Sequence, residues 1–351
     1  MQSDVSELVN QTAREHDFSG AVRVGVGGDA VVSAAFGYAD RTHSVDNTTD
    51  TRFGIASGSK LFTALGIGAL IDDSRLTLDT RLHDACSHDL AGIATDVTIA
   101  QLLTHTSGVY DYYDEELIDD SDGFELSVAP HKLLRPSDYL PMVVGGEMKS
   151  SPGERFSYSN GGYVLLGMLI EELCGDFHQF IKSRVMDAAG LDSSGYFRFD
   201  QLPERTATGY IETDEGWRTN IYTLPIVGGP DGGAFATTSD MEQLWRAFLR
   251  GRILSPALTR KFTSKAVRCG DSTYYGHGVW IHDDGNQPPV IYVTGSDAGV
   301  SFKSSCHGDA IVATVISNTS TGAWPMAKSI DAFLRQEIPS AERSFSFELE
   351  P

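Results

Sequence analysis

The sequence predicts an α+β protein in which an antiparallel sheet, built from both ends of the chain and flanked by helices, carries a mostly helical inserted region. Strand patterns with turn signals occur near the N-terminus and return after residue 275. The stretch between them has helical spacing and loops. This order fits one sheet with an insertion. We therefore expect a sheet region made of residues 1–75 and 205–351, an inserted region of residues 76–204, and a functional site at their interface.

The first elements follow from the spacing of apolar residues. Residues 5–16 place Val5, Val9 and their neighbours on one helical face, which predicts a helix. Residues 19–26 and 30–37 have strand character around Gly27-Gly28-Asp29, which predicts two strands joined by a tight turn. The glycines here indicate a hairpin and not a nucleotide site, because no helix follows them.

Helices and strands are expected in blocks along the rest of the chain. An acidic, aromatic segment at 110–126 predicts a surface loop, and Ser239 is a plausible N-cap for the helix that it opens. The expected helices are 57–71, 99–103, 163–173, 177–188, 239–249 and 325–337, and the expected late strands are 275–281, 290–294, 300–304 and 310–317.

Composition and charge exclude several classes of protein. The chain of 351 residues carries 27 Lys and Arg against 48 Asp and Glu, a net charge of -21, which argues against nucleic acid or an anionic membrane as a partner. Aspartate exceeds glutamate, 31 to 17, and lysine is scarce at 8. Two explanations stay open: a saline habitat, or an ordinary acidic protein.

Targeting and metal signals are missing from the sequence. No apolar run is long enough to span a membrane, and Met1 to Val5 lacks the basic and apolar parts of a secretory signal. We expect a cytoplasmic protein, although a trimmed export signal would leave the same start. Four scattered cysteines predict reduced thiols, and no motif for a metal or cofactor is present, so we expect neither: the cysteines are Cys86, Cys174, Cys269 and Cys306.

Ser57 and Lys60 form an S-x-x-K motif at the start of an apolar helix. Because three residues make just under one helical turn, the serine hydroxyl and the lysine amine face the same way. A serine becomes nucleophilic when a base takes its proton, and a desolvated lysine can be that base. Of the 8 lysines only Lys60 has a serine three positions earlier.

Two further motifs can complete such a site. Tyr158 and Asn160 form a Y-x-N, in which a phenol can shuttle protons and an amide can hold the lysine or a substrate carbonyl. A plain alternative is that Asn160 caps the following helix. Thr294-Gly295-Ser296 ends a predicted strand, and a Thr-Gly turn on an edge strand would offer backbone N–H groups to an oxyanion.

Taken in this order, Ser57, Tyr158 and Thr294-Gly295 resemble the serine β-lactamase and penicillin-binding protein family, most closely its class C branch with the related D-aminopeptidases and esterases. Residues 102–108, 152–162, 232–240 and 275–278 are similar to that family too. The resemblance implies a β-lactamase/transpeptidase-like fold. It also implies that Ser57 is acylated, that Lys60 and Tyr158 share the acid–base work, and that Asn160 contacts Lys60 or substrate. The N–H groups of Ser57 and Ser296 would form the oxyanion hole.

Val293 departs from the family pattern, which usually has Lys or His before Thr-Gly. That cation helps to bind a substrate carboxylate, and Ser296-Asp297 makes the pocket still less favourable to anions. We therefore expect a serine hydrolase that acts on an ester or amide with a small-molecule or peptide-like acyl group. The alternative is a catalytically weak binding or sensing protein on the same fold, and the sequence leaves the oligomeric state open.

Other candidates have plain explanations. His105, in Thr104-His105-Thr106-Ser107-Gly108, is explained as well by a structural turn as by a catalytic triad. No G-x-S-x-G nucleophile elbow is present. The tyrosines at 110, 112 and 113 either line a cleft or belong to an exposed loop.

Overall fold

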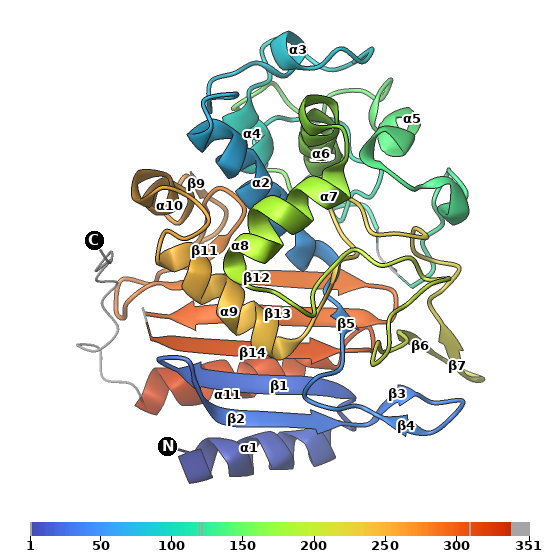
Figure 1. Ribbon diagram of the computed structural model, residues 1–351, viewed down its shortest axis with the longest axis vertical. Helices are drawn as coiled ribbons and strands as arrows, with labels where there is room; N and C mark the ends of the chain where they lie inside the picture. Colours follow the sequence, from blue (N-terminus) through green and yellow to red (C-terminus); the bar gives the residue numbers. More distant parts are fainter. Residues whose placement is uncertain (1, 119, 121, 309, 338–351) are drawn as a thin grey trace.

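The centre of the fold is an eight-stranded sheet in which every strand pair is antiparallel (Figure 1). The structure, a computed structural model, describes residues 2–118, 120, 122–308 and 310–337. The strands lie in the order β2-β1-β14-β13-β12-β11-β10-β9, so both chain ends build the sheet, as the sequence predicts. Their bounds are β1 Gly20–Val26, β2 Asp29–Phe36, β9 Val267–Arg268, β10 Thr273–Tyr275, β11 Trp280–His282, β12 Val290–Asp297, β13 Val300–His307 and β14 Ile311–Ser317.

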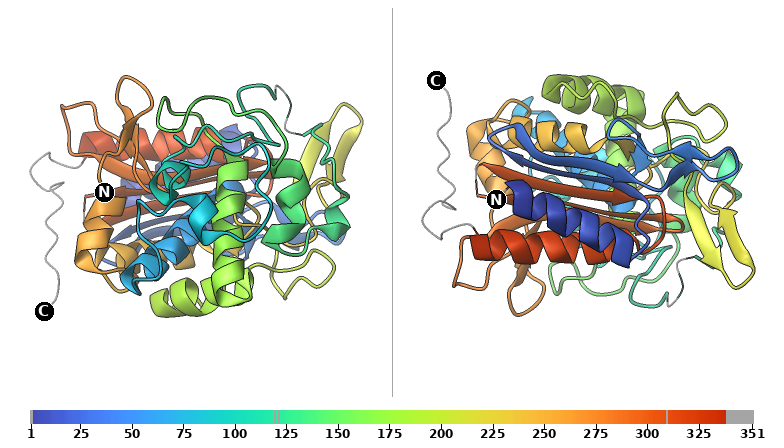
Figure 2. Two further views of the ribbon diagram at one scale, coloured as in Figure 1. Left: turned by 90° about the horizontal axis from the view of Figure 1, so that it is seen from above. Right: turned by 90° about the horizontal axis from the view of Figure 1, so that it is seen from below.

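One face of the sheet is covered by α1 (Gln2–Glu15) and α11 (Ala323–Glu337), which lie side by side (Figure 2). Because side chains alternate along a strand, Val22 and Val24 of β1 join this core while Ala21 faces the other side. The predicted first and last helices are confirmed; α1 lies at residues 2–15 instead of 5–16, and α11 begins two residues before the predicted start.

The opposite face packs against α9 (Thr238–Leu249) and, beyond it, the helices of the middle of the chain (Figure 1). The buried indole of Trp245 on α9 donates a hydrogen bond of 2.9 Å to Ser304 Oγ on β13, which fixes the helix on the sheet. The other helices are α2 Lys60–Asp72, α3 Leu82–Ala85, α4 Ile99–Leu103, α5 Leu140–Val143, α6 Asn160–Cys174, α7 Phe177–Ile181, α8 Asp187–Ala189 and α10 Pro256–Phe262. One π-helical turn, Lys182–Met186, joins α7 to α8, and 3₁₀ turns lie at Ala56–Ser59 (η1), Pro130–Lys132 and Pro136–Tyr139.

Short strand pairs lie beside the main sheet. They are β3 Tyr38–Asp40 with β4 Val45–Asp46, β5 Phe53–Gly54 with β8 Phe235–Ala236, and β6 Tyr210–Thr213 with β7 Gly216–Thr219. Between residues 76 and 204 the described residues form helices, turns and loops with no named strand. The division into regions 1–75 plus 205–351 and 76–204 stays a prediction.

Two strand predictions are wrong. Residues 275–281 are not one strand but the end of β10, a turn and the start of β11; Gly278 takes a φ of +98° there, and a Cβ on Gly276 would lie 2.4 Å from the Phe262 carbonyl oxygen. Thr294-Gly295 is not a turn, because β12 continues to Asp297 and pairs with β13 along its whole length.

Two helix caps also differ from the prediction. Helix α9 is capped by Thr237, whose hydroxyl accepts the Asp240 N–H, and not by Ser239. Helix α6 begins at Asn160, and Ser159 caps it by accepting the Gly162 N–H at 3.0 Å. The alternative role of Asn160 as a helix cap is therefore wrong, which leaves its side chain available for other contacts.

Candidate active site

Ser57 lies in η1, a short 3₁₀ turn that packs against the part of β12 that β11 leaves unpaired. Strand β11 pairs with β12 only from Val290 to Tyr292, so residues 293–297 lie beyond that pairing and η1 lies against β12 there. Gly295 permits the approach, because a Cβ on it would lie 2.3 Å from the Ile55 carbonyl oxygen and 2.9 Å from the Ser57 nitrogen. Ala56 takes a left-handed φ of +46°, a strained conformation of the kind found at functional sites.

Lys60 points its ammonium nitrogen at Ser57 from the first turn of α2. Its Nζ lies 2.9 Å from Ser57 Oγ, and it donates to Asn160 Oδ1 at 2.7 Å and to the Asp231 carbonyl oxygen at 2.6 Å. The last two atoms can only accept hydrogen bonds. When Lys60 is neutral, its lone pair therefore takes the remaining direction, toward the Ser57 hydroxyl.

Burial and nearby carboxylates act on Lys60 in opposite directions. Only 2% of Lys60 is exposed. Burial lowers its pKa below the ordinary lysine value, and this effect outweighs the attraction of Asp231, Glu115, Asp111 and Asp297, which raises it. A lowered pKa makes the neutral amine, the form that can take a proton from Ser57, more accessible.

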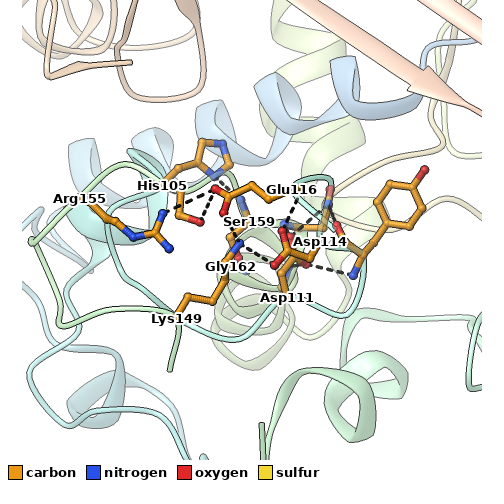
Figure 3. Close-up of polar contacts among 12 residues, drawn as sticks. His105, Asp111, Asp114, Glu116, Lys149, Arg155, Ser159 and Gly162 are labelled. Carbon is orange, nitrogen blue, oxygen red and sulfur yellow. Dashed lines mark hydrogen bonds and ion pairs between the residues drawn. The ribbon is translucent and has the colours of Figure 1, made fainter. Parts of the chain in front are cut away.

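Asn160 is held in place by the buried carboxylate of Asp111, which comes from the acidic loop (Figure 3). Asp111 accepts the backbone N–H groups of Asn160 at 2.9 Å and Gly161 at 3.0 Å, at the positive end of α6. The Asn160 amide also donates to the Tyr113 carbonyl oxygen at 2.8 Å. These bonds orient the Asn160 Oδ1 atom toward Lys60.

The acidic segment predicted as a surface loop is attached to the chain before α6. The Lys149 ammonium pairs with Asp114 at 2.8 Å, and Glu116 pairs with Arg155 at 3.6 Å (Figure 3). Ser157 also donates to Glu116 at 3.0 Å. Tyr112, Tyr113 and Phe124 of this segment line the pocket beside Ser57. Residues 119 and 121 of the segment lie outside the described residues.

Tyr158 lies next to the serine and lysine, and a buried histidine packs on its ring. Lys60 Nζ is 4.9 Å from the centre of the Tyr158 ring, and the ring of His105 is 4.2 Å from it. Burial, with the nearby Glu115 charge, raises the pKa of Tyr158 well above its ordinary value, although a hydrogen bond with Ser57 acts in the other direction. His105 accepts the Ser159 N–H through Nδ1 at 3.0 Å, so it contacts the backbone and the Tyr158 ring and not Ser107.

The third predicted motif, Thr294-Gly295-Ser296, presents its backbone and not its side chains to the site. The Thr294 hydroxyl donates to the Phe302 carbonyl oxygen at 3.0 Å, and the Ser296 side chain is exposed. Gly295 lies against Ser57, as described above. The structure thus brings Ser57, Lys60, Tyr158, Asn160 and Gly295 together, while Thr294 contributes its side chain to the sheet.

A pocket of about 680 Å³, including its opening to solvent, lies beside Ser57. Aromatic side chains, among them Tyr112, Tyr113 and Phe124, line it together with Asp231 and Asp297. Of the expected tyrosines, Tyr110 is therefore outside this pocket. Val293 is 4% exposed within the hydrophobic core, so it supplies no group to the pocket.

Sequence reasoning missed Asp111 and Asp231 as parts of the site. Both act through contacts between distant residues: the Asp231 carbonyl meets a lysine 171 residues away. The one available signal for Asp231 was its position within the glycine-rich run 228–233, whose small residues allow a close approach to η1.

The chain belongs to the beta-lactamase family, because the sequence model of that family matches residues 5–332. This match confirms the predicted resemblance to the serine β-lactamase and penicillin-binding protein family, and the antiparallel sheet flanked by helices is the fold that the resemblance implies. The chain is 30% identical over 313 residues to penicillin-binding protein 4* of Bacillus subtilis, covering 84% of this chain and 66% of that protein. The chain thus spans slightly less than two thirds of the length of this relative.

Solved structures agree with the fold. A penicillin-binding protein from Bacillus halodurans is 40% identical with a TM-score of 0.88, covering 93% of this chain and 99% of its own. A D-amino acid amidase from Ochrobactrum anthropi, at 20% identity and a TM-score of 0.75, covers 95% of this chain and 100% of its own and shows the fold alone. Within the described residues no helix is both long and apolar enough to cross a bilayer.

Proposed function

We propose that this chain is a serine hydrolase that cleaves an ester or amide through an acyl-enzyme on Ser57. The observation that carries the proposal is the distance of 2.9 Å from Lys60 Nζ to Ser57 Oγ, with the other two directions of the lysine nitrogen taken by carbonyl acceptors. This geometry aims the lone pair of a neutral lysine at the proton that must leave the serine.

The pKa directions support the proposed acid and base roles. The pKa of Lys60 is lowered by burial and that of Tyr158 is raised by burial, so Lys60 is the base and Tyr158 keeps its proton. Ser57 Oγ attacks the carbonyl carbon while Lys60 takes its proton. Tyr158, hydrogen-bonded to Ser57, is placed to relay a proton to the departing alcohol or amine as the ester or amide bond breaks. Water then attacks the acyl carbonyl carbon; the same groups take a proton from that water and deliver it to Ser57 Oγ as the acyl–oxygen bond breaks, which releases the acid.

Backbone N–H groups stabilise the oxyanion in this proposal. Ser57 lies in the first turn of η1, where N–H groups have no acceptor within the helix. The Ser296 N–H, on the part of β12 beyond the pairing with β11, is the second donor. Removing one such donor typically lowers kcat by about a hundredfold or more.

Replacement of the nucleophile tests the proposal. Wild type, Ser57→Ala and the exposed control Ser183→Ala are mixed with p-nitrophenyl acetate and with benzylpenicillin, and intact mass and product release are followed. We expect repeated release of p-nitrophenol by wild type and Ser183→Ala, and loss of at least about a thousandfold of that rate in Ser57→Ala. Full turnover by Ser57→Ala contradicts the proposal.

The mass measurement separates the second candidate, a slowly acylated penicillin-binding or sensing protein, which the names of the relatives favour. A benzylpenicillin adduct on Ser57 that lasts, with a single equivalent of p-nitrophenol released from the ester, supports that candidate. Rapid turnover of the ester without a lasting penicillin adduct supports the hydrolase.

A further inference from the structure

The pocket beside Ser57 has an unusual balance of charge. Two carboxylates, Asp231 and Asp297, line it, and the described residues around it include no Lys, Arg or His. The remaining lining is mainly aromatic and aliphatic. A ligand that enters this pocket therefore meets two carboxyl groups on apolar walls.

Asp297 is placed to face the reacting serine. It lies two residues after Gly295 on β12, so both residues are on the face of the strand that meets η1. A Cβ on Gly232 would lie 3.8 Å from Asp297 Oδ2 and 3.7 Å from the Ala56 carbonyl oxygen, which puts this carboxylate beside the residue before Ser57. Among the described residues, no donor makes a hydrogen bond to the Asp297 side chain.

Lys60 does not neutralise these carboxylates by direct contact. Its three hydrogen-bonding directions lead to Ser57 Oγ, Asn160 Oδ1 and the main-chain oxygen of Asp231. The Asp231 carboxylate is instead oriented by the Tyr112 hydroxyl, which donates to Oδ2 at 2.5 Å. A cation that bonds to Asp297 has to come from outside the described protein.

The Tyr139 hydroxyl is a second, independent observation that points to a polar ligand group in this pocket. It lines the same pocket, only 1% of it is exposed, and its hydroxyl has no hydrogen-bond partner among the described residues. A buried hydroxyl without a partner is unfavourable. An ammonium group donates up to three hydrogen bonds, and this hydroxyl and the two carboxylates are acceptors for it.

We propose that the acyl donor carries a protonated amine, which binds at Asp231 and Asp297 while an apolar or aromatic part of the acyl group fills the pocket. The inference rests on the proposed function, because it names the substrate class of the same site. Neutral acyl groups bind more weakly, and carboxylate-bearing acyl groups are repelled.

Binding and turnover are measured separately, so that the two proposals fail in different ways. Phenylalanine amide, in both enantiomers, and its neutral N-acetyl counterpart are titrated calorimetrically into Ser57→Ala protein, which prevents turnover. Of the two enantiomers of phenylalanine amide, we expect the one with the higher affinity to bind about tenfold or more tightly than its own N-acetyl form. We expect Asp297→Asn, in the same background, to reduce that ratio to near one.

Two further variants serve as a repeat of the test and as its control. Asp297→Ala repeats the test if the asparagine variant folds poorly, and the exposed Asp271→Asn serves as a charge control that keeps the ratio. A ratio at or below one in the parent protein, or one that Asp297→Asn and Asp297→Ala leave unchanged, overturns the inference. So does an absence of binding by every amide tested.

Turnover of the matching p-nitroanilides by the wild type reports on the proposed function. If the amine preference holds in binding while Ser57→Ala still releases p-nitroaniline as fast as the wild type, the cation pocket stands and the acyl-enzyme on Ser57 does not. If turnover depends on Ser57 while the binding ratio is at or below one, the hydrolase stands and the cation pocket does not.

Discussion

Asp297 illustrates how a single residue can lower the stability of this protein for the sake of its pocket. Burial raises the pKa of its carboxyl from 3.8 to about 7. The folded protein thus holds this proton more tightly than the unfolded chain does. The stability associated with it is complete below pH 3.8 and is lost as the pH rises through about 7.

We therefore expect Asp297→Asn to be more stable than the wild type at pH 8, with a smaller advantage at pH 5. The change in that advantage is on the order of 2 kcal/mol, since one pKa unit corresponds to about 1.4 kcal/mol and the group is partly exposed. Urea unfolding at both pH values measures it, with Asp271→Asn as the control. An advantage that is equal at both pH values, or larger at pH 5, contradicts the assignment.

At this scale, local spacing decides what the sequence can predict. Ser57 and Lys60 lie within one turn, so their proximity follows from helix geometry, and a distance of 2.9 Å agrees with it. Asn160 was found by its motif, but its contact with Lys60 needs the packing of α6 against α2. Asp111 and Asp231 reach the site through loops, for which no periodicity exists.

At the scale of elements, the approach of η1 to β12 holds Ser57, the proposed nucleophile, beside the proposed oxyanion donors. Gly295 is the residue that permits it, because the Ile55 carbonyl oxygen and the Ser57 nitrogen would lie 2.3 Å and 2.9 Å from a Cβ there. These are backbone atoms, so no side-chain rotation can relieve the clash. Either η1 or β12 has to shift.

Gly295→Ala is accordingly expected to lower the rate of Ser57 acylation about a hundredfold or more, since misplacing reacting groups by about 1 Å has that effect. Stopped-flow release of p-nitrophenol measures the acylation step. Gly270→Ala is the matched control: a Cβ at Gly270 would lie 3.7 Å from its nearest neighbour, an ordinary contact. Acylation at the wild-type rate in Gly295→Ala would show that η1 and β12 are not held as closely as described.

Elements were predicted well where periodicity is strong and less well where glycine or a cap decides. The helix at Ile99–Leu103 has the predicted ends, and β13 and β14 were found with small shifts. Residues 275–281 misled the prediction because apolar residues continue through the turn that Gly276 and Gly278 make. Thr237 replaces Ser239 as a cap, since both are acceptable cap residues and tertiary packing selects one.

For the whole molecule, the pairing of β1 with β14 joins strands from the two ends of the chain into one sheet. Gly20 pairs with Ser317 and Val26 with Ile311, so the first hairpin closes against the last strand. The sequence could predict this arrangement, because strand patterns occur at both ends and helices between them. It could not predict the strand order, which depends on contacts between residues far apart in the chain.

The net charge of -21 makes the salt response a property of the whole molecule. Like charges repel across the surface, and added salt screens them, because the Debye length falls from about 30 Å at 0.01 M to about 3 Å at 1 M. Many surface ion pairs weaken at the same time, but each contributes no more than about 1 kcal/mol. The excess of acidic over basic groups, 48 to 27, therefore determines the sign of the response.

We expect the melting temperature at pH 7.5 to rise by about 2 °C or more between 10 mM and 0.5 M NaCl. Differential scanning calorimetry at pH 4.7, the isoelectric point that the amino-acid composition gives, is the control, and there the rise is expected to disappear. A melting temperature that falls with salt at pH 7.5 would mean that the ion pairs outweigh the repulsion.

The same titration separates the two explanations of the acidic composition. Repulsion is almost fully screened by 1 M, so a rise that ends there fits an ordinary acidic protein, whereas a rise that continues to 3 M fits a surface adapted to strong salt.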